Sequence, residues 1–460
     1  MSRVAVVGGG ITGLVAARTL ALAGADVTLV DPGPLGGKVQ TSAFDGGTLD
    51  EAADAFLARV PEGVELCREL GLEGELVSPA ARRAHVWSRG ALRPLPEAQL
   101  LGVPTDLDEL AASGIVSPEG LERARLDLTL PGSPLHDDVS IGAVMRARLG
   151  DEVTERLVDP LVGGINAGDT DRLSLAATVP QLDAAVRSGV ASLVEACRAK
   201  RASVADPAAP VFYAPRRGMG ALPAALAADL DARGVAFVTE TAEALAKSVG
   251  GWQLRLTSGG AVDVDGVVLA APAGVSARLV GPQAPTAAEL LEAIPYASVA
   301  LVALAVPREG VDRVLDGSGF LVPRVEGRTV TACSWTTSKW PHLGGEGTVW
   351  LRASVGRDGH GEALASDDDG LLAHVLTDLR TTMELRGAPT EARVTRWPSS
   401  FPQYRPGHLD RVDAIDADVQ ARAVGIEVAG AALRGLGVPA CIRQGAAAAH
   451  RLLATLGGST

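Results

Sequence analysis

The stretch RVAVVGGGITG, residues 3–13, decides the fold. The apolar run Val4 to Val7 predicts a short strand, the three glycines after it predict a tight turn, and Ile11 to Ala23 predicts a buried helix. Gly24 ends this helix, and Val27 to Val30 predicts a second strand. These elements form a β-α-β unit, whose two strands we expect to be parallel and joined by a right-handed crossover.

The glycines Gly8, Gly10 and Gly13 form the pattern G-x-G-x-x-G between the predicted strand and helix. Glycine lets the backbone turn tightly and approach a phosphate, and the helix N-terminus offers unpaired N–H groups. A glycine triplet alone could be only a tight turn. Here an acidic residue, Asp31, closes the second strand, where it can accept a hydrogen bond from a ribose hydroxyl and would repel a 2′-phosphate. The unit therefore predicts a dinucleotide site.

A second glycine segment favours FAD over NAD. Pro32-Gly33-Pro34-Leu35-Gly36-Gly37-Lys38 places another Gly-Gly pair and a basic residue just after Asp31. Such a segment is typical of flavoproteins that enclose the pyrophosphate and ribityl groups from both sides. Near the end of the chain, Ile426 to Leu453 predicts a strand, a glycine-rich loop and a helix that return to the first domain.

The rest of the chain predicts a helical region followed by a sheet. Residues Leu95 to Ala202 have capping signals and no clear alternating strands, so we expect a helical insertion. Strand patterns return later in the chain, and we place the last three of them in a mixed or antiparallel sheet of a second domain. They are Val235–Val238, Trp252–Leu256, Val267–Ala270, Val299–Ala305, Thr329–Cys333 and Val349–Ser354.

Composition excludes several classes of protein. A chain of 460 residues with 47% hydrophobic residues can fill two or three cores. The net charge of −13 argues against a nucleic-acid partner.

No apolar run reaches the ~20 residues of a membrane-spanning helix, and the N-terminus has no export signal. The scattered histidines and cysteines support no metal site, and the cysteines suggest reduced thiols in the cytoplasm. The cysteines are Cys67, Cys197, Cys333 and Cys441.

Lysine is rare: only Lys38, Lys200, Lys247 and Lys339 occur among 42 basic residues. A GC-rich genome that favours arginine codons explains this bias. Each remaining lysine is therefore slightly more informative than usual.

Taken together, the motifs resemble the protoporphyrinogen and coproporphyrinogen III oxidase family, in its oxygen-dependent, FAD-containing and actinobacterial form. This family lies within the flavin amine oxidase and phytoene desaturase superfamily. The resemblance covers nearly the whole chain. Its more specific segments are Gly164-Ile165-Asn166-Ala167-Gly168-Asp169, Ala332-Cys333-Ser334-Trp335 to Lys339-Trp340-Pro341, Leu351 to Arg357, Arg396-Trp397, Pro402-Gln403-Tyr404 and Gly407-His408.

The resemblance implies an α/β fold with a Rossmann-type FAD-binding domain, a second α+β substrate domain and a helical insertion. The expected FAD-binding domain is discontinuous and comprises residues 1–77, 206–286 and 410–460. The substrate domain comprises residues 78–94 and 287–409, and the helical domain residues 95–205.

The resemblance also implies which residues contact FAD. Two departures from the family pattern stand out: Ala52-Ala53 replaces Gly-Pro, and Asn166 replaces a common aromatic residue. The expected cofactor-binding residues are Gly8, Gly9, Gly10, Ile11, Thr12, Gly13, Asp31, Pro32, Gly36, Gly37, Lys38, Ala52, Ala53, Asp54, Ala55, Ala242, Trp397, Gly430, Leu436, Gly437, Val438 and Pro439.

The implied activity is oxidation of a porphyrinogen, a cyclic tetrapyrrole, to a porphyrin in haem biosynthesis, with O2 as acceptor and H2O2 as product. The flavin performs the hydride abstraction, so no catalytic residue of the protein is named. Guanidinium groups suit propionates, which makes Arg82 and Arg83 substrate-binding candidates together with Asn166. The alternative for each arginine is a solvated surface side chain.

Coproporphyrinogen III is favoured as the substrate, partly through the resemblance to actinobacterial members. The alternatives are protoporphyrinogen IX, then the reactions of a flavin amine oxidase or a carotenoid-type desaturase. Three tyrosines are too few for an easily built aromatic cage, which disfavours the amine oxidase. From another class, the chain could be a non-catalytic flavin-binding redox sensor. A peripheral membrane contact, the oligomeric state and the physiological electron acceptor stay open.

Overall fold

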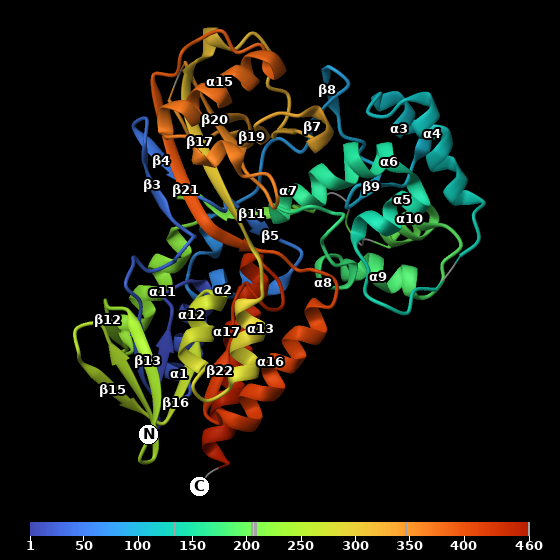
Figure 1. The fold of residues 1–460 in the computed structure, drawn as a ribbon. Helices are drawn as coiled ribbons and strands as arrows, with labels where there is room; N and C mark the ends of the chain where they lie inside the picture. The colour runs from blue at the N-terminus through green and yellow to red at the C-terminus, as the bar shows by residue number, and fades with distance from the viewer. Residues whose placement is uncertain (133, 204–205, 207–208, 346, 459–460) are drawn as a thin grey trace.

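The computed structural model describes residues 1–132, 134–203, 206, 209–345 and 347–458. Its lower part in Figure 1 is built on a parallel sheet in the order β12-β2-β1-β16-β22. The strands are β12 (Ala236–Val238), β2 (Asp26–Val30), β1 (Arg3–Val7), β16 (Gly266–Leu269) and β22 (Ile426–Val428). The first and last segments of the chain thus share one sheet, as the sequence predicts.

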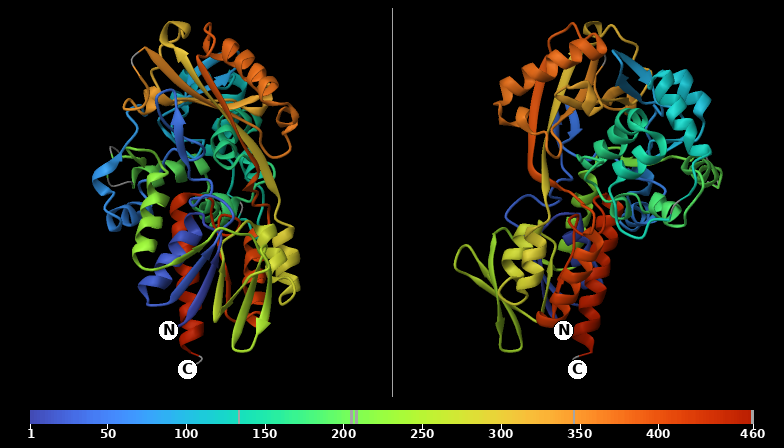
Figure 2. Two further views of the ribbon diagram at one scale, coloured as in Figure 1. Left: turned by 90° about the vertical axis from the view of Figure 1, so that its left-hand side faces the viewer. Right: turned by 45° about the vertical axis from the view of Figure 1, so that its right-hand side comes forward.

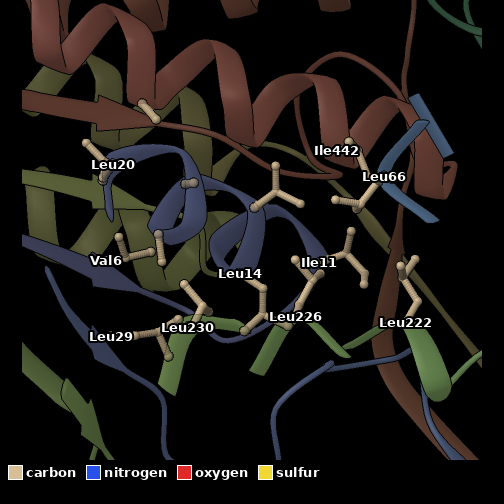
Figure 3. Packing of buried hydrophobic residues seen from close by; sticks show 14 of the residues in the cluster. Val6, Ile11, Leu14, Leu20, Leu29, Leu66, Leu222, Leu226, Leu230 and Ile442 are labelled. Atoms are coloured by element: carbon tan, nitrogen blue, oxygen red, sulfur yellow. The ribbon is translucent and has the colours of Figure 1, made fainter. Parts of the chain in front are cut away.

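Both faces of this sheet are covered, which is why its strands are apolar without alternation. Val4 and Val6 of β1 point to one face, where they pack against four helices, and Figure 3 shows part of this core around Leu14 and Leu226. The helices are α1 (Ile11–Leu22), α2 (Pro61–Glu69), α11 (Ala221–Ala232) and α17 (Val438–Gly457).

Ala5 and Val7 point to the opposite face, where they pack against a second core. A three-stranded antiparallel sheet and three helices form this layer. They are β13 (Ala242–Ser248), β14 (Gly251–Leu256), β15 (Ala261–Val264), α12 (Ala273–Val280), α13 (Pro285–Glu292) and α16 (His408–Arg422).

The upper part contains a seven-stranded sheet in the order β21-β17-β20-β19-β18-β7-β8. Only β18 and β7 pair in parallel, so the sheet is mixed, and α15 (Asp368–Met383) packs on one face. The strands are β21 (Glu391–Pro402), β17 (Tyr296–Pro307), β20 (Thr348–Val355), β19 (Val330–Trp335), β18 (Gly319–Leu321), β7 (His85–Ser88) and β8 (Ala91–Pro94). Figure 2 shows β17 and β21 running down toward the parallel sheet.

A helical region lies beside this sheet, on the right in Figure 1. It contains one feature that the sequence analysis missed, a two-stranded ladder of β9 (Gln99–Leu100) and β10 (Val103–Pro104). Leu101 and Gly102 both have positive φ, so two residues suffice for the turn and each strand is too short to show alternation. The helices are α3 (Leu107–Ser113), α4 (Pro118–Arg125), α5 (Ile141–Leu149), α6 (Asp151–Val153), the π-helix η3 (Thr154–Gly163), α7 (Gly164–Asn166), α8 (Leu175–Thr178), α9 (Pro180–Arg187) and α10 (Leu193–Ala202).

Short strands connect these parts. The hairpin of β3 (Thr41–Phe44) and β4 (Gly47–Asp50) leads to β5 (Phe56–Leu57), and β11 (Phe212–Pro215) pairs with both β5 and β6 (Leu76–Val77). The domain bounds given above stay our proposal. Within the residues that the structure describes, no helix combines the length and hydropathy that a bilayer crossing requires.

Candidate flavin and substrate site

The turn between β1 and α1 is built for close packing at two glycines and for open space at a third. Gly8 has φ of 109°, and a Cβ on Gly13 would lie 1.8 Å from the Gly8 carbonyl oxygen. Gly10 differs: its φ of −71° suits any residue, and its Cβ would meet no protein atom within 4 Å. Neither strain nor packing requires glycine there. The open space in front of Gly10 lies at the start of α1, where a phosphate would be bound.

The second glycine segment lies directly against the first. The Gly36 N–H donates to the Gly9 carbonyl over 2.7 Å, and Gly10 and Gly36 form an isolated parallel bridge. Asp31 connects the two segments, because its carboxylate accepts the N–H of Gly9 at 2.6 Å and of Gly33 at 2.7 Å. A carboxylate oxygen can accept a second hydrogen bond, so Asp31 keeps acceptor capacity for a ribose hydroxyl. Its neighbour, Pro32, is exposed.

The C-terminal loop reaches the same place. Helix α17 packs on α1 so tightly that a Cβ on Gly445 would lie 2.3 Å from the Thr12 carbonyl oxygen. Both α1 and α17 begin without a side-chain cap, at Gly10 and Gly437 respectively. Their first N–H groups are therefore available to a ligand. Val438 and Pro439 are the first residues of α17, Leu436 and Gly437 directly precede them, and Gly430 lies at the beginning of the loop before this helix.

Lys38 lies beside the start of α17. Its side chain is solvent-accessible, but desolvation by the surrounding protein lowers the pKa of its ammonium group. The thiol of Cys441, in the first turn of α17, interacts with both Lys38 and Thr12. The predicted contacts at Ile11, Thr12, Gly37 and Lys38 thus gather around the two helix N-termini.

The segment from Asp50, the last residue of β4, to Ala55 is hydrogen-bonded to the seven-stranded sheet. Trp397 on β21 donates its indole N–H to the Glu51 carbonyl at 2.9 Å. Arg352 on β20 donates to the Asp50 carbonyl at 2.9 Å. The predicted residues Ala52, Ala53, Asp54 and Ala55 are half-buried in this segment.

The Asp54 carboxylate is held by two cations. Its Oδ2 lies 2.8 Å from the Lys339 Nζ and 3.3 Å from the Arg352 Nη2. Burial would raise the pKa of Asp54, but these two charges outweigh burial and hold it well below the usual range. Asp54 is therefore a fixed anion.

Nearby Asp50 behaves in the opposite way. Burial raises its pKa to about 6, although its Oδ1 accepts hydrogen bonds from Thr41 and from the Met219 N–H at 2.8 Å. The two carboxyl groups, four residues apart, thus titrate in different pH ranges.

The remaining predicted cofactor residue, Ala242, is buried at the start of β13. It belongs to the same core cluster as Val30, the residue before Asp31. Val238, four residues before Ala242, accepts the Asp31 N–H at 3.1 Å, which places this part of the chain beside the end of β2.

On the substrate side, Asn166 and Trp397 come together. Ala167, which follows Asn166, shares a hydrophobic cluster with Trp397 and Phe401. The Asn166 side chain donates to the Val162 carbonyl at 2.8 Å, and the Asn166 backbone carbonyl accepts from the Gln403 side chain at 2.9 Å. Ile165 is 67% exposed, which leaves an apolar surface on this loop.

The two predicted arginines lie elsewhere. Arg82 and Arg83 are exposed in the segment before β7, and Arg83 pairs with Glu97 over 3.8 Å. Arg93, in the same neighbourhood, donates to the Ser88 carbonyl at 2.9 Å. The role of Arg82 and Arg83 in propionate binding stays a prediction. No group of three or more metal-ligating side chains occurs within the described part of the chain.

Sequence reasoning gave no role to Lys339 and Arg352, although both stand in segments that carry the resemblance. Their partner Asp54 is about 285 residues away from Lys339 in the chain, so only the folded sheet brings them together. The rarity of lysine was the one available signal for Lys339.

These features define a flavin-dependent oxidoreductase, and comparison with known proteins agrees. The model of the family "Flavin containing amine oxidoreductase" matches residues 11–453. Coproporphyrinogen III oxidase of Bacillus subtilis is 34% identical to the chain over 98% of both sequences. The chain therefore belongs to the flavin-containing amine oxidoreductase family, and within it to the porphyrinogen oxidases.

Two further relatives support this placement. A crystal structure assigned as a protoporphyrinogen oxidase from Exiguobacterium sp. 255-15 superimposes with a TM-score of 0.87, at 30% identity and with 98% of each chain covered. Chloroplastic protoporphyrinogen oxidase 1 of Arabidopsis thaliana is 27% identical over 95% of this chain and 85% of its own length.

Proposed function

We propose that this protein oxidises coproporphyrinogen III to coproporphyrin III in haem biosynthesis, with bound FAD as the oxidant of the substrate. The observation that carries the proposal is the full-length similarity to a coproporphyrinogen III oxidase at 34% identity, against 30% and 27% to the two proteins named as protoporphyrinogen oxidases. The four free thiols lead us to propose the cytoplasm as its location.

The geometry supports FAD as the form of the flavin. The open space at Gly10 lies between two uncapped helix starts, and each start favours negative charge through its unpaired N–H groups and its dipole. We assign the start of α1 to the pyrophosphate and Asp31 to the adenosine ribose. The Gly36-Gly37-Lys38 segment covers the pyrophosphate from the other side.

Trp397 and the start of α17 would hold the flavin end of the cofactor. When bound, FAD would supply the chemistry of hydride acceptance from a bridge carbon, and each oxidation also releases one proton from the macrocycle. The N-terminus of α17 would stabilise negative charge that develops on a reduced flavin. The fixed Asp54–Lys339–Arg352 group holds the Asp50–Ala55 segment in place against the substrate sheet.

The protein orients the macrocycle and excludes water from it. Ile165 and the half-buried Trp397 offer apolar surface on the substrate side. The apolar rings of a tetrapyrrole suit such surfaces, whereas its propionates need cations or solvent. We propose O2 as the final acceptor, reduced to H2O2 by the two electrons and two protons of each oxidation.

A test compares the purified protein with each candidate substrate under air. We expect consumption of O2 and formation of H2O2 with coproporphyrinogen III, together with the absorbance of a porphyrin. Turnover of an amine or a polyene in its place would favour the other oxidases of the family. Bound flavin without turnover of any of these compounds would favour a redox sensor.

A further inference from the structure

The segment Pro402 to His408 joins the substrate sheet to the cofactor part of the molecule, yet the proposed function gives it no role. It begins at the end of β21 and ends at the first residue of α16. Gln403, Tyr404 and His408 are all buried in it, with exposures of 0%, 3% and 0%. Three polar side chains buried so completely need partners, and their partners belong to two different loops.

Tyr404 holds the loop in front of α17. Its hydroxyl donates to the Ala431 carbonyl at 2.5 Å and accepts the Gly435 N–H at 2.9 Å. The loop between Gly430 and Gly437 carries several of the predicted flavin contacts. One hydroxyl thus bridges two backbone groups of a loop whose Gly430 and Gly435 both have positive φ.

His408 supports the same loop from the same side. Its ring stacks on that of Tyr404 with centroids 4.1 Å apart, and its Nε2 lies 2.8 Å from the Leu433 carbonyl oxygen. Burial lowers the pKa of His408 to about 4, so at neutral pH the ring is uncharged and its Nε2–H donates. Gln444 of α17 completes the support, since it accepts the Arg434 N–H at 3.1 Å.

The residue before Tyr404 reaches the other loop. Gln403 donates from Nε2 to the Asn166 carbonyl at 2.9 Å, which fixes the loop that carries Ile165 and Asn166. The Tyr404 backbone carbonyl accepts the Ser174 N–H at 2.7 Å, a second link to the helical region. The adjacent residues Gln403 and Tyr404 therefore bind the loop at Asn166 and the loop at 430–437, respectively.

We propose that Gln403 and Tyr404 are positioning residues that couple the substrate-facing loop at Asn166 to the flavin-facing loop at 430–437. The inference rests on the proposed function, because that function assigns the two loops to substrate and flavin. A shift of either loop is transmitted through one peptide unit to the other. Neither side chain needs to touch the reacting atoms.

The test uses the flavin-loaded protein and the rate at which flavin is released after dilution, followed by the fluorescence of free flavin. Tyr404→Phe removes one hydroxyl and its two hydrogen bonds to the 430–437 loop, so we expect release about tenfold faster. Gln403→Met removes hydrogen bonds to Asn166 and Phe401, neither of which belongs to the 430–437 loop, yet coupling predicts release about threefold faster and a changed visible flavin spectrum.

Tyr296→Phe is the matched control. It makes the same chemical change nearby, but its hydroxyl accepts the N–H of Ala273 at the start of α12. We expect flavin release and spectrum like those of the wild type. Gln403→Leu, which removes the donor without burying a charge, replaces Gln403→Met if that variant does not fold.

Two results would overturn the inference. Release from Tyr404→Phe at the rate of the control would show that the hydroxyl only stabilises the fold. An unchanged release rate and spectrum in the Gln403 variant would show that the two loops are independent. No porphyrinogen is needed for these measurements, so failure of the proposed substrate would be seen separately.

Discussion

Replacing Gly10 with valine should remove the flavin and leave the fold intact. The backbone of Gly10, with φ of −71° and ψ of 175°, is open to valine, and the new Cβ would meet no protein atom within 4 Å. Valine is a poorer N-cap than glycine, so we expect the apoprotein to lose at most about 1 kcal/mol of unfolding free energy.

The effect on the flavin should be far larger. The side chain would fill the space in front of α1 and push the pyrophosphate away from the helix start. Loss of two charge-assisted hydrogen bonds costs about 3–6 kcal/mol. This corresponds to a factor of about 10² to 10⁴ in the dissociation constant of FAD. The purified variant should then be colourless.

The assay pairs two measurements, titration of apoprotein with FAD and urea unfolding of the same apoprotein. Gly13→Ala is the contrasting variant, because its Cβ would lie 1.8 Å from the Gly8 carbonyl oxygen and should prevent folding. Gly74→Val is the neutral control, since its Cβ also meets no atom within 4 Å and Gly74 is not among the predicted flavin contacts. Full yellow absorbance and unchanged affinity in Gly10→Val would refute the assignment of the pyrophosphate to this turn.

Three further predictions concern charged groups. Asp31→Ala should weaken FAD binding about tenfold to a hundredfold in titrations, because a charge-assisted bond is worth about 1.5–3 kcal/mol; equal affinity would remove Asp31 from the site. Burial raises the pKa of the Asp50 carboxyl group from 3.8 to about 6, so the folded protein binds this proton more tightly than the unfolded chain does. The resulting contribution to the free energy of unfolding is complete below pH 4 and is lost as the pH rises through 6. In urea unfolding, the free energy of unfolding of Asp50→Asn minus that of the wild type should therefore rise by up to about 3 kcal/mol between pH 4 and pH 8. A difference that stays constant over this pH range would contradict the prediction. Arg82→Ala combined with Arg83→Ala should raise KM for coproporphyrinogen III about twofold to fivefold with kcat unchanged, as expected for exposed ion pairs; an unchanged KM would exclude both arginines from propionate binding.

The local elements could be predicted from the sequence because their signals are local. The glycine turn, the strand before it and the helix after it are fixed by neighbours in the chain, and β1 and α1 begin and end within one residue of the prediction. The return of Ile426–Val428 to the parallel sheet was also predicted and is confirmed by its pairing with β16.

The contacts between distant segments could not be predicted in this way. The hydrogen bond from Trp397 to Glu51 and the pairing of Lys339 with Asp54 depend on how two sheets face each other, which no periodicity encodes. The π-helix at 154–163 contains Pro160, which by itself indicates only a break or kink in a helix. The functions of Tyr404 and His408 likewise appear only when the 430–437 loop is placed beside them.

The central claim is that the chain oxidises coproporphyrinogen III. The most direct measurement is kcat/KM for coproporphyrinogen III and for protoporphyrinogen IX on the same flavin-loaded preparation, at one oxygen concentration, because this ratio compares transition-state binding of the two substrates. We predict the larger value for coproporphyrinogen III. A clear preference for protoporphyrinogen IX would contradict the substrate, and no oxidation of either compound would contradict the claim as a whole.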